Sequence, residues 1–118
     1  MVLDPADYAQ LECITRQLPG ITSGVTYTRF VRKGIVKVYE DGSEFPIGKG
    51  VVLHESDKDV ATIITSGIMV DESLKAYEAL QAEGISVRVI DMFTWNPLDE
   101  ELVIKAAKET GAIVTAEN

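Results

Sequence analysis

The chain has 118 residues, of which 46% are hydrophobic and 25% are charged, a composition typical of one modest globular domain. Its formal net charge of −8 at pH 7 argues against a nucleic-acid or anionic-membrane surface, because such partners need clustered Lys and Arg. One cysteine and one histidine exclude an internal disulfide and a Cys/His metal site, and no apolar run reaches the roughly 20 residues of a membrane span, so we expect a soluble, cytoplasmic protein.

The first forty residues combine one helical pattern with two strand patterns. Asp4 is placed to cap a helix and Pro5 to take its first position, and apolar residues then recur at helical spacing as far as Leu18. Next come β-branched and aromatic residues with nearly alternating polarity. This pattern predicts one strand at 25–31 and another at about 35–39.

A turn-rich segment at 40–50 separates this part from a regular alternation of strands and helices. The patterns predict strands at 50–56, 59–67 and 85–92, helices at about 70–83 and from Asn96-Pro97 to Thr110, and a last strand after Gly111. The strand at 59–67 is apolar enough for the centre of a sheet. The order βαβαβ predicts an α/β fold, a mostly parallel sheet covered by helices, with a possible antiparallel edge strand.

The turn at Ser66-Gly67 lies between a predicted strand and a predicted helix and has two interpretations. Backbone N–H groups at such a turn can bind an anion. However, Asp71 and Glu72 lie in the first turn of the same helix and would repel a phosphate. We therefore favour a packing turn, which needs small residues for steric reasons.

Few side chains of the sequence are candidates for chemistry. His54 and Cys13 have no second histidine or cysteine to complete a site. We interpret His54 as a surface or satisfied core residue and Cys13 as a small buried hydrophobic residue. Arg29 and Arg32, in TYTRFVRK, are stronger candidates, because an arginine at the end of a strand can present a fork to a phosphate or carboxylate. A solvated strand end is the alternative, and the residues alone leave both open.

Several stretches spread over the whole chain carry a family pattern, and they read PADYAQLECITRQL, VTYTRFVRK, FPIGKG, ITSGIMV, VRVIDMFTWNPLD and GAIVTAEN. Together they resemble the C-terminal part of transketolase-like, thiamine-diphosphate-dependent enzymes. By this resemblance, residues 1–34 are the tail of a pyrimidine-binding domain, 35–47 a connecting seam, and 48–118 part of a transketolase C-terminal domain. Because the chain stops directly after a predicted strand, we expect it to be a truncated section of a longer protein.

The resemblance also implies a function. Transketolases move a two-carbon ketol unit between sugar phosphates in the pentose phosphate pathway, with thiamine diphosphate and a divalent metal such as Mg²⁺. The family's diphosphate motif and activating glutamate do not occur in this sequence, so we expect no catalytic, cofactor-binding or metal-binding residue here and no activity of the chain alone. Arg29 matches an arginine that contacts the sugar phosphate, and Arg32 is a weaker candidate.

The expected partners follow from the same comparison. The section would supply scaffold and dimerisation surface to the remainder of a transketolase chain, or to an N-terminal-section subunit, in a homodimer or another homo-oligomer. Two related enzymes are alternatives, 1-deoxyxylulose-5-phosphate synthase and the β subunit of a 2-oxo acid dehydrogenase. A non-enzymatic α/β module that binds a partner protein or a small acid is the alternative of a different class.

Overall fold

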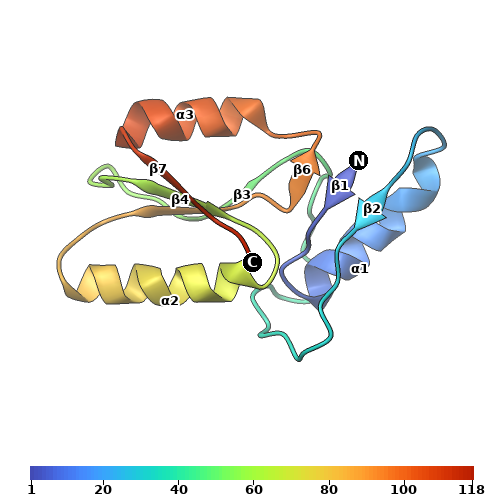
Figure 1. Cartoon of the computed structure of the whole chain (residues 1–118), viewed down its shortest axis with the longest axis horizontal. Helices are drawn as coiled ribbons and strands as arrows, with labels where there is room; N and C mark the ends of the chain where they lie inside the picture. The colour runs from blue at the N-terminus through green and yellow to red at the C-terminus, as the bar shows by residue number, and fades with distance from the viewer.

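The computed structural model describes all residues, 1–118, as two β-sheets that lie side by side with three α-helices (Figure 1). The smaller sheet has the strand order β2-β1-β6, and the larger sheet has the order β3-β5-β4-β7. No helix combines the length and apolar character needed to cross a membrane.

The smaller sheet joins the beginning of the chain to a segment far along it. β1 (Val2–Leu3) pairs in parallel with β2 (Tyr27–Thr28) and antiparallel with β6 (Thr94–Asn96). Helix α1 (Tyr8–Gln17) connects β1 to β2 and is followed by a 3₁₀ turn at Leu18–Gly20. Because β6 comes from the C-terminal half, the two halves of the chain share this sheet.

The larger sheet confirms the predicted fold class. β4 (Thr62–Thr65) pairs in parallel with β5 (Arg88–Asp91) and with β7 (Ile113–Ala116), and β3 (Val51–His54) is the antiparallel edge strand beside β5. β4 lies inside the sheet, as its apolar sequence predicts. All four residues of β5 are buried, which makes it the most enclosed strand.

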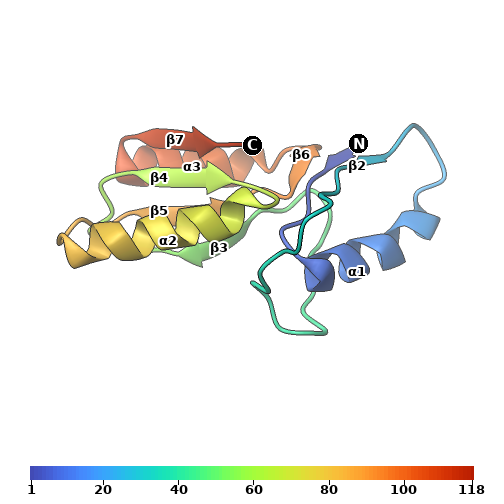
Figure 2. The same cartoon turned by 60° about the horizontal axis from the view of Figure 1, so that its bottom comes forward.

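Two helices cover the larger sheet, as the pattern predicts. Figures 1 and 2 show α2 (Met69–Ala82) on one face and α3 (Glu100–Thr110) on the other. α3 ends at Gly111, whose φ of 73° is the left-handed conformation that glycine adopts at helix ends. The sheet is therefore the middle layer of three.

Each sheet has its own apolar core. The core beside the smaller sheet consists of Leu3, Ile14, Phe45 and Phe93, and the core beneath α3 consists of Ile90, Met92 and Ala106. Met92 and Phe93 are neighbours in the chain and pack into different cores. The segment that joins β5 to β6 therefore anchors the two sheets to each other.

The predicted start of the first helix is wrong. α1 begins at Tyr8, and its cap is Asp7, whose Oδ1 accepts the backbone N–H three residues later at 3.0 Å. The backbone N–H of Asp4 instead donates to the carbonyl of Phe93 at 2.7 Å. Asp4 and Pro5 therefore extend the strand and do not begin the helix.

The strand predicted at about 35–39 is also wrong. The backbone N–H groups of Val38 and Tyr39 both donate to Oδ2 of Asp7, each at 2.8 Å. A strand pair would need these donors for a neighbouring backbone. Because one buried carboxylate occupies them, the segment runs as an irregular connection.

The last helix begins later than predicted. Asn96 lies in β6, and α3 starts at Glu100. Its cap is Asp99, whose Oδ1 accepts the N–H of Leu102 at 3.3 Å. Asn96-Pro97 carries a capping pattern of its own, but pairing of Asn96 with β1 removes it from the helix.

Candidate functional site

The carboxyl ends of four strands meet where the two sheets adjoin. Asp4 follows β1, Arg29 follows β2, Ser66 follows β4, and Asn118 lies two residues beyond β7. Trp95, from β6, completes the group, which we call the Arg29 cluster. Parallel strands bring their carboxyl ends to one edge, where α/β proteins most often bind ligands.

Arg29 is held by a buried carboxylate and an aromatic ring. Its Nε donates to Oδ1 of Asp4 at 2.9 Å, and its Nη2 donates to Oδ2 at 2.6 Å. The guanidinium carbon lies 4.8 Å from the ring centroid of Trp95, which is a cation–π distance. Hydrogen bonding by Asp4 raises the pKa of Arg29 above its ordinary value, so the side chain stays charged.

Asp4 is fixed by the turn that follows β4. It is 4% exposed, and its Oδ2 also accepts from Ser66 Oγ at 2.7 Å, while Trp95 Nε1 donates to that hydroxyl at 2.9 Å. A Cβ on Gly67 would lie 2.5 Å from the Asp4 carboxylate, so only glycine allows this approach. Ser66-Gly67 is thus the packing turn that the sequence predicts, and Ser66 Oγ forms its hydrogen bonds with the side chains of Asp4 and Trp95.

The outer edge of Arg29 faces the end of β7. Nη2 donates to Oδ1 of Asn118 at 2.8 Å and Nη1 to its carbonyl at 3.3 Å, with a Glu117 carboxylate oxygen 3.8 Å from Nη1. The side chain of Arg29 keeps 22% of its surface exposed. An anion that binds Arg29 has to approach along this outer edge and replace its hydrogen bonds to Asn118. Arg32 is exposed and forms no ion pair in the structure.

Two small cavities flank the cluster. One, of about 120 Å³, is lined by Asp4 and Arg29 together with apolar residues of the 30–35 segment. The other, of about 190 Å³, is lined by Ser66 and Trp95 and by the end of β7. Of the two cavities, only the smaller one is lined by Arg29 itself.

These residues do not fit thiamine diphosphate or its metal. No group of three or more His, Cys, Asp or Glu side chains in the structure could hold a metal ion. The Arg29 cluster offers one cation, and its only carboxylate at hydrogen-bonding distance already pairs with that cation. We therefore assign no residue of this chain to the cofactor.

A second polar group surrounds Asp91 at the end of β5. Its Oδ2 accepts from Gln10 Nε2 at 2.9 Å and from the Tyr39 hydroxyl at 2.6 Å, while its Oδ1 has no partner. Burial raises the pKa of Asp91 to about 7. The sequence patterns did not single out Asp91, although an acidic residue at the end of the strand RVID, whose four residues are all buried, is a visible signal.

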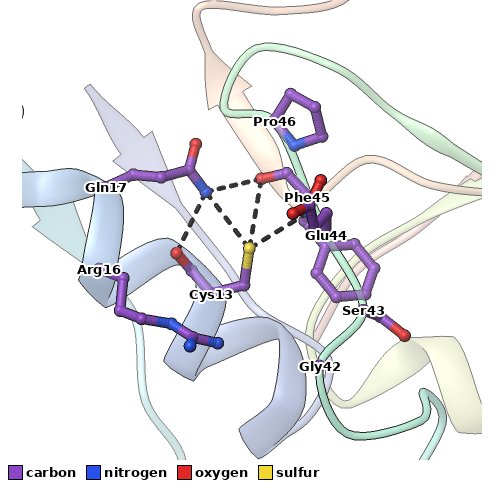
Figure 3. Close-up of a pocket in the computed structure, with 8 residues that line it drawn as sticks. All are labelled: Cys13, Arg16, Gln17, Gly42, Ser43, Glu44, Phe45 and Pro46. Atoms are coloured by element: carbon purple, nitrogen blue, oxygen red, sulfur yellow. Dashed lines mark hydrogen bonds between the residues drawn. The ribbon is translucent and has the colours of Figure 1, made fainter.

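A further cavity, of about 490 Å³, lies beside Cys13, and Figure 3 shows its lining of Cys13, Arg16, Gln17, Gly42, Ser43, Glu44, Phe45 and Pro46. The Gln17 amide donates to the carbonyls of Cys13 (3.1 Å) and Phe45 (2.8 Å), and the Phe45 N–H donates to Cys13 Sγ at 3.2 Å. Cys13 therefore packs α1 against the 42–46 segment. His54 likewise packs, with its ring stacked 3.9 Å from that of Tyr77.

Comparisons with a family model and with known proteins all lead to the same protein family. A family model described as the transketolase C-terminal domain matches residues 48–118. The chain is 42% identical over 117 residues to the 6-deoxy-6-sulfo-D-fructose transketolase subunit SqwH of Clostridium sp. (strain MSTE9), covering 99% of this chain and 35% of that protein. It is 35% identical over 103 residues to human transketolase, covering 86% of this chain and 16% of that protein.

Solved structures agree. A structure described as "Split gene transketolase, inactive beta4 tetramer" matches with a TM-score of 0.92 and 43% identity, over 99% of this chain and 38% of that one. A transketolase of Pichia stipitis matches with a TM-score of 0.79 at 18% identity, over 98% of this chain and 18% of that one, a likeness of fold. The chain spans little more than a third of these relatives at most. This chain belongs to the transketolase family, through the C-terminal domain that its residues 48–118 match.

Proposed function

We propose that the chain is a section of a transketolase and that the complete enzyme transfers a two-carbon ketol unit between sugars with an acidic terminal group. The observation that carries this is the extent of the likeness, 42% identity over 99% of the chain, which includes the residues before the family-model match. The terminal group is a phosphate, as the resemblance implies, or a sulfonate, as in the sugar named for SqwH. Thiamine diphosphate and a divalent metal supply the ketol-transfer chemistry and bind outside this chain.

Two comparisons support an enzyme divided between chains. SqwH is described as a subunit, and the structure with a TM-score of 0.92 is described as the product of a split gene. We propose that residues 1–34 are the tail of a pyrimidine-binding domain and that 48–118 are part of the C-terminal domain. Residues 35–47 connect these two domains. In this arrangement the section supplies scaffold and contacts between repeated copies of the divided enzyme, which is cytoplasmic.

The direct test is to combine the complete protein that contains this section with a chain that carries the diphosphate-binding motif. We expect ketol transfer from a sugar phosphate or sulfo-sugar, measured by a coupled assay of the aldose product, only when both parts are present. The section by itself should be inactive. Activity of the section alone, or no transfer by the combined enzyme with any acidic sugar, would contradict the proposal.

We propose that Arg29 binds the terminal acidic group of the sugar. Arg29→Ala in the combined enzyme should raise KM for the sugar about ten- to a hundredfold with a smaller change in kcat, because a charge-assisted fork is lost. Arg29→Lys keeps the positive charge, so its KM should lie between those of the wild type and Arg29→Ala.

The same substitution also leaves Asp4 buried without its partner, so thermal unfolding has to be followed alongside the kinetics. Arg88→Ala is a matched control, because Arg88 is 4% exposed and pairs with Glu109 on α3, away from the Arg29 cluster. It should lower stability without raising KM. An unchanged KM in Arg29→Ala would show that Arg29 does not contact the sugar.

A further inference from the structure

The charges around Arg29 are unusual for an anion-binding arginine. Its positive charge is faced by the Asp4 carboxylate through two hydrogen bonds, and by Glu117 at 3.8 Å. No lysine or second arginine forms an ion pair with either carboxylate. The charges of Arg29, Asp4 and Glu117 add up to −1. Arg29 therefore offers hydrogen bonds to an anion without a net positive charge around it.

The negative charge of Asp4 is held in place. The residue is 4% exposed, receives a hydrogen bond from Ser66, and lies against Gly67, where any side chain would collide with it. Solvent and salt screen a buried charge weakly. An anion at the outer edge of Arg29 therefore experiences Asp4 as well as the guanidinium.

The consequence depends on the charge of the ligand. A terminal phosphate and a terminal sulfonate both present three oxygens to the N–H groups of Arg29, so their hydrogen bonding is alike. Their charges differ, because a phosphate monoester carries about −1.5 to −2 at pH 7 and a sulfonate carries −1. Repulsion from Asp4 grows with ligand charge and weighs more heavily on the phosphate.

We propose that Asp4 is a specificity-determining residue that makes the complete enzyme prefer a sugar with a singly charged terminal group, a sulfonate, over one with a doubly charged phosphate. Asp4 acts through Arg29 and does not touch the sugar. The inference rests on the proposed function, in which Arg29 contacts the terminal group.

The test compares two ketol donors, 6-deoxy-6-sulfo-D-fructose and fructose 6-phosphate, in the combined enzyme. The wild type should have the higher kcat/KM with the sulfo-sugar. Asp4→Asn should shift the ratio of the two kcat/KM values toward the phosphate by about tenfold, which corresponds to about 1.4 kcal/mol. Asparagine is the chosen replacement because it keeps one oxygen for the bonds from Arg29 Nη2 and Ser66 Oγ.

A matched control removes the same charge elsewhere. Asp59 is 8% exposed and lies 3.7 Å from the buried Arg88, away from the Arg29 cluster. Asp59→Asn should leave the ratio of the two kcat/KM values unchanged. This control tests whether a change in the ratio requires removal of the charge beside Arg29, or whether removal of any buried carboxylate produces it.

A pH profile gives a second readout that a structural role of Asp4 would not move. The phosphate gains a proton near pH 6 and becomes singly charged, whereas the sulfonate does not titrate there. The wild-type ratio should therefore shift toward the phosphate as the pH falls from 7.5 to 5.5, to a smaller degree in Asp4→Asn.

The outcomes are distinguishable. If Asp4→Asn leaves the ratio unchanged, or lowers both kcat/KM values equally, the role of Asp4 is overturned and the proposed function stands. If the combined enzyme transfers no ketol unit from either sugar, the proposed function itself fails, and the inference about Asp4 fails with it.

Discussion

At the scale of single residues, the molecule contains a carboxyl group whose pKa is raised by burial. Asp91 is fully buried, and Gln10 and Tyr39 both donate to the same carboxyl oxygen. The pKa of Asp91 is raised to about 7, chiefly because burial disfavours the charged form and despite the two hydrogen bonds, which favour it. Asp91 therefore couples folding to pH.

The sign of this coupling follows from the raised pKa. Below about pH 4 the carboxyl group is protonated in both the folded and the unfolded chain. As the pH rises toward 7, the unfolded chain loses this proton while the folded chain keeps it, so stability declines. Asp91→Asn mimics the protonated form and should stabilise the chain above pH 7 by on the order of 4 kcal/mol, with no gain well below pH 4.

Urea unfolding of the wild type and Asp91→Asn from pH 3 to 8 checks this expectation. The difference between the two free energies of unfolding isolates Asp91 from the other carboxyl groups. A difference that is constant across the range would show that Asp91 titrates normally in the folded chain.

At the scale of elements, the turn between β4 and α2 fixes the smaller sheet to the larger one. The N–H of Gly67 donates to the carbonyl of Asp4 at 3.0 Å, and Ser66 Oγ donates to the carboxylate of the same residue. The positive φ of Gly67, 57°, and the closeness of Asp4 both require glycine. One turn thus combines a backbone requirement with a steric one.

Two glycine substitutions separate these requirements. Gly111 also has a positive φ, 73°, at the end of α3, but nothing lies within 4 Å of the position where its Cβ would be. Gly111→Ala should cost about 1 kcal/mol of stability, from backbone strain alone. Gly67→Ala should cost about 2 to 4 kcal/mol, because the methyl group also displaces Asp4. Thermal unfolding measures both, and equal costs would contradict the close packing of Asp4 on this turn.

At the scale of the whole molecule, apolar side chains are exposed at the outermost strands of both sheets. Val25, Tyr27 and Phe30, in and around β2, are 82%, 59% and 66% exposed, and Val114 in β7 is 54% exposed. β2 and β7 each leave one edge without a partner strand. Open edges with apolar side chains favour association with further polypeptide.

The 118-residue chain by itself should therefore self-associate, with a sedimentation coefficient that increases with concentration. Phe30→Glu and Val114→Lys should each shift it toward the monomer, because a charge on a sheet edge opposes pairing. Ile104→Lys is the control, since Ile104 is 52% exposed on α3 and lies on no sheet edge. A wild-type chain that stays monomeric at every concentration would contradict this expectation.

The sequence determined the regular elements of the larger sheet. Strand and helix periodicities placed β3, β4, α2 and β5 within a few residues of their observed positions, because these elements bury a face whose pattern is local. Gly111 ended α3 as predicted, since only glycine is at ease in that backbone conformation. The family pattern also singled out Arg29, whose binding of an acidic sugar group stays a prediction.

The tertiary structure alone decided what occupies the space around that residue. Asp4 and Asp7 both precede the first helix, and either could cap it. Only the tertiary structure shows that Asp7 is the cap and that Asp4 is the ion-pair partner of Arg29. The short strands β1 and β6 pair across more than 90 residues of sequence, too far apart and too short for a local pattern. Local periodicity reports which face a residue presents, whereas the meeting of four strand ends depends on contacts between segments distant in the chain.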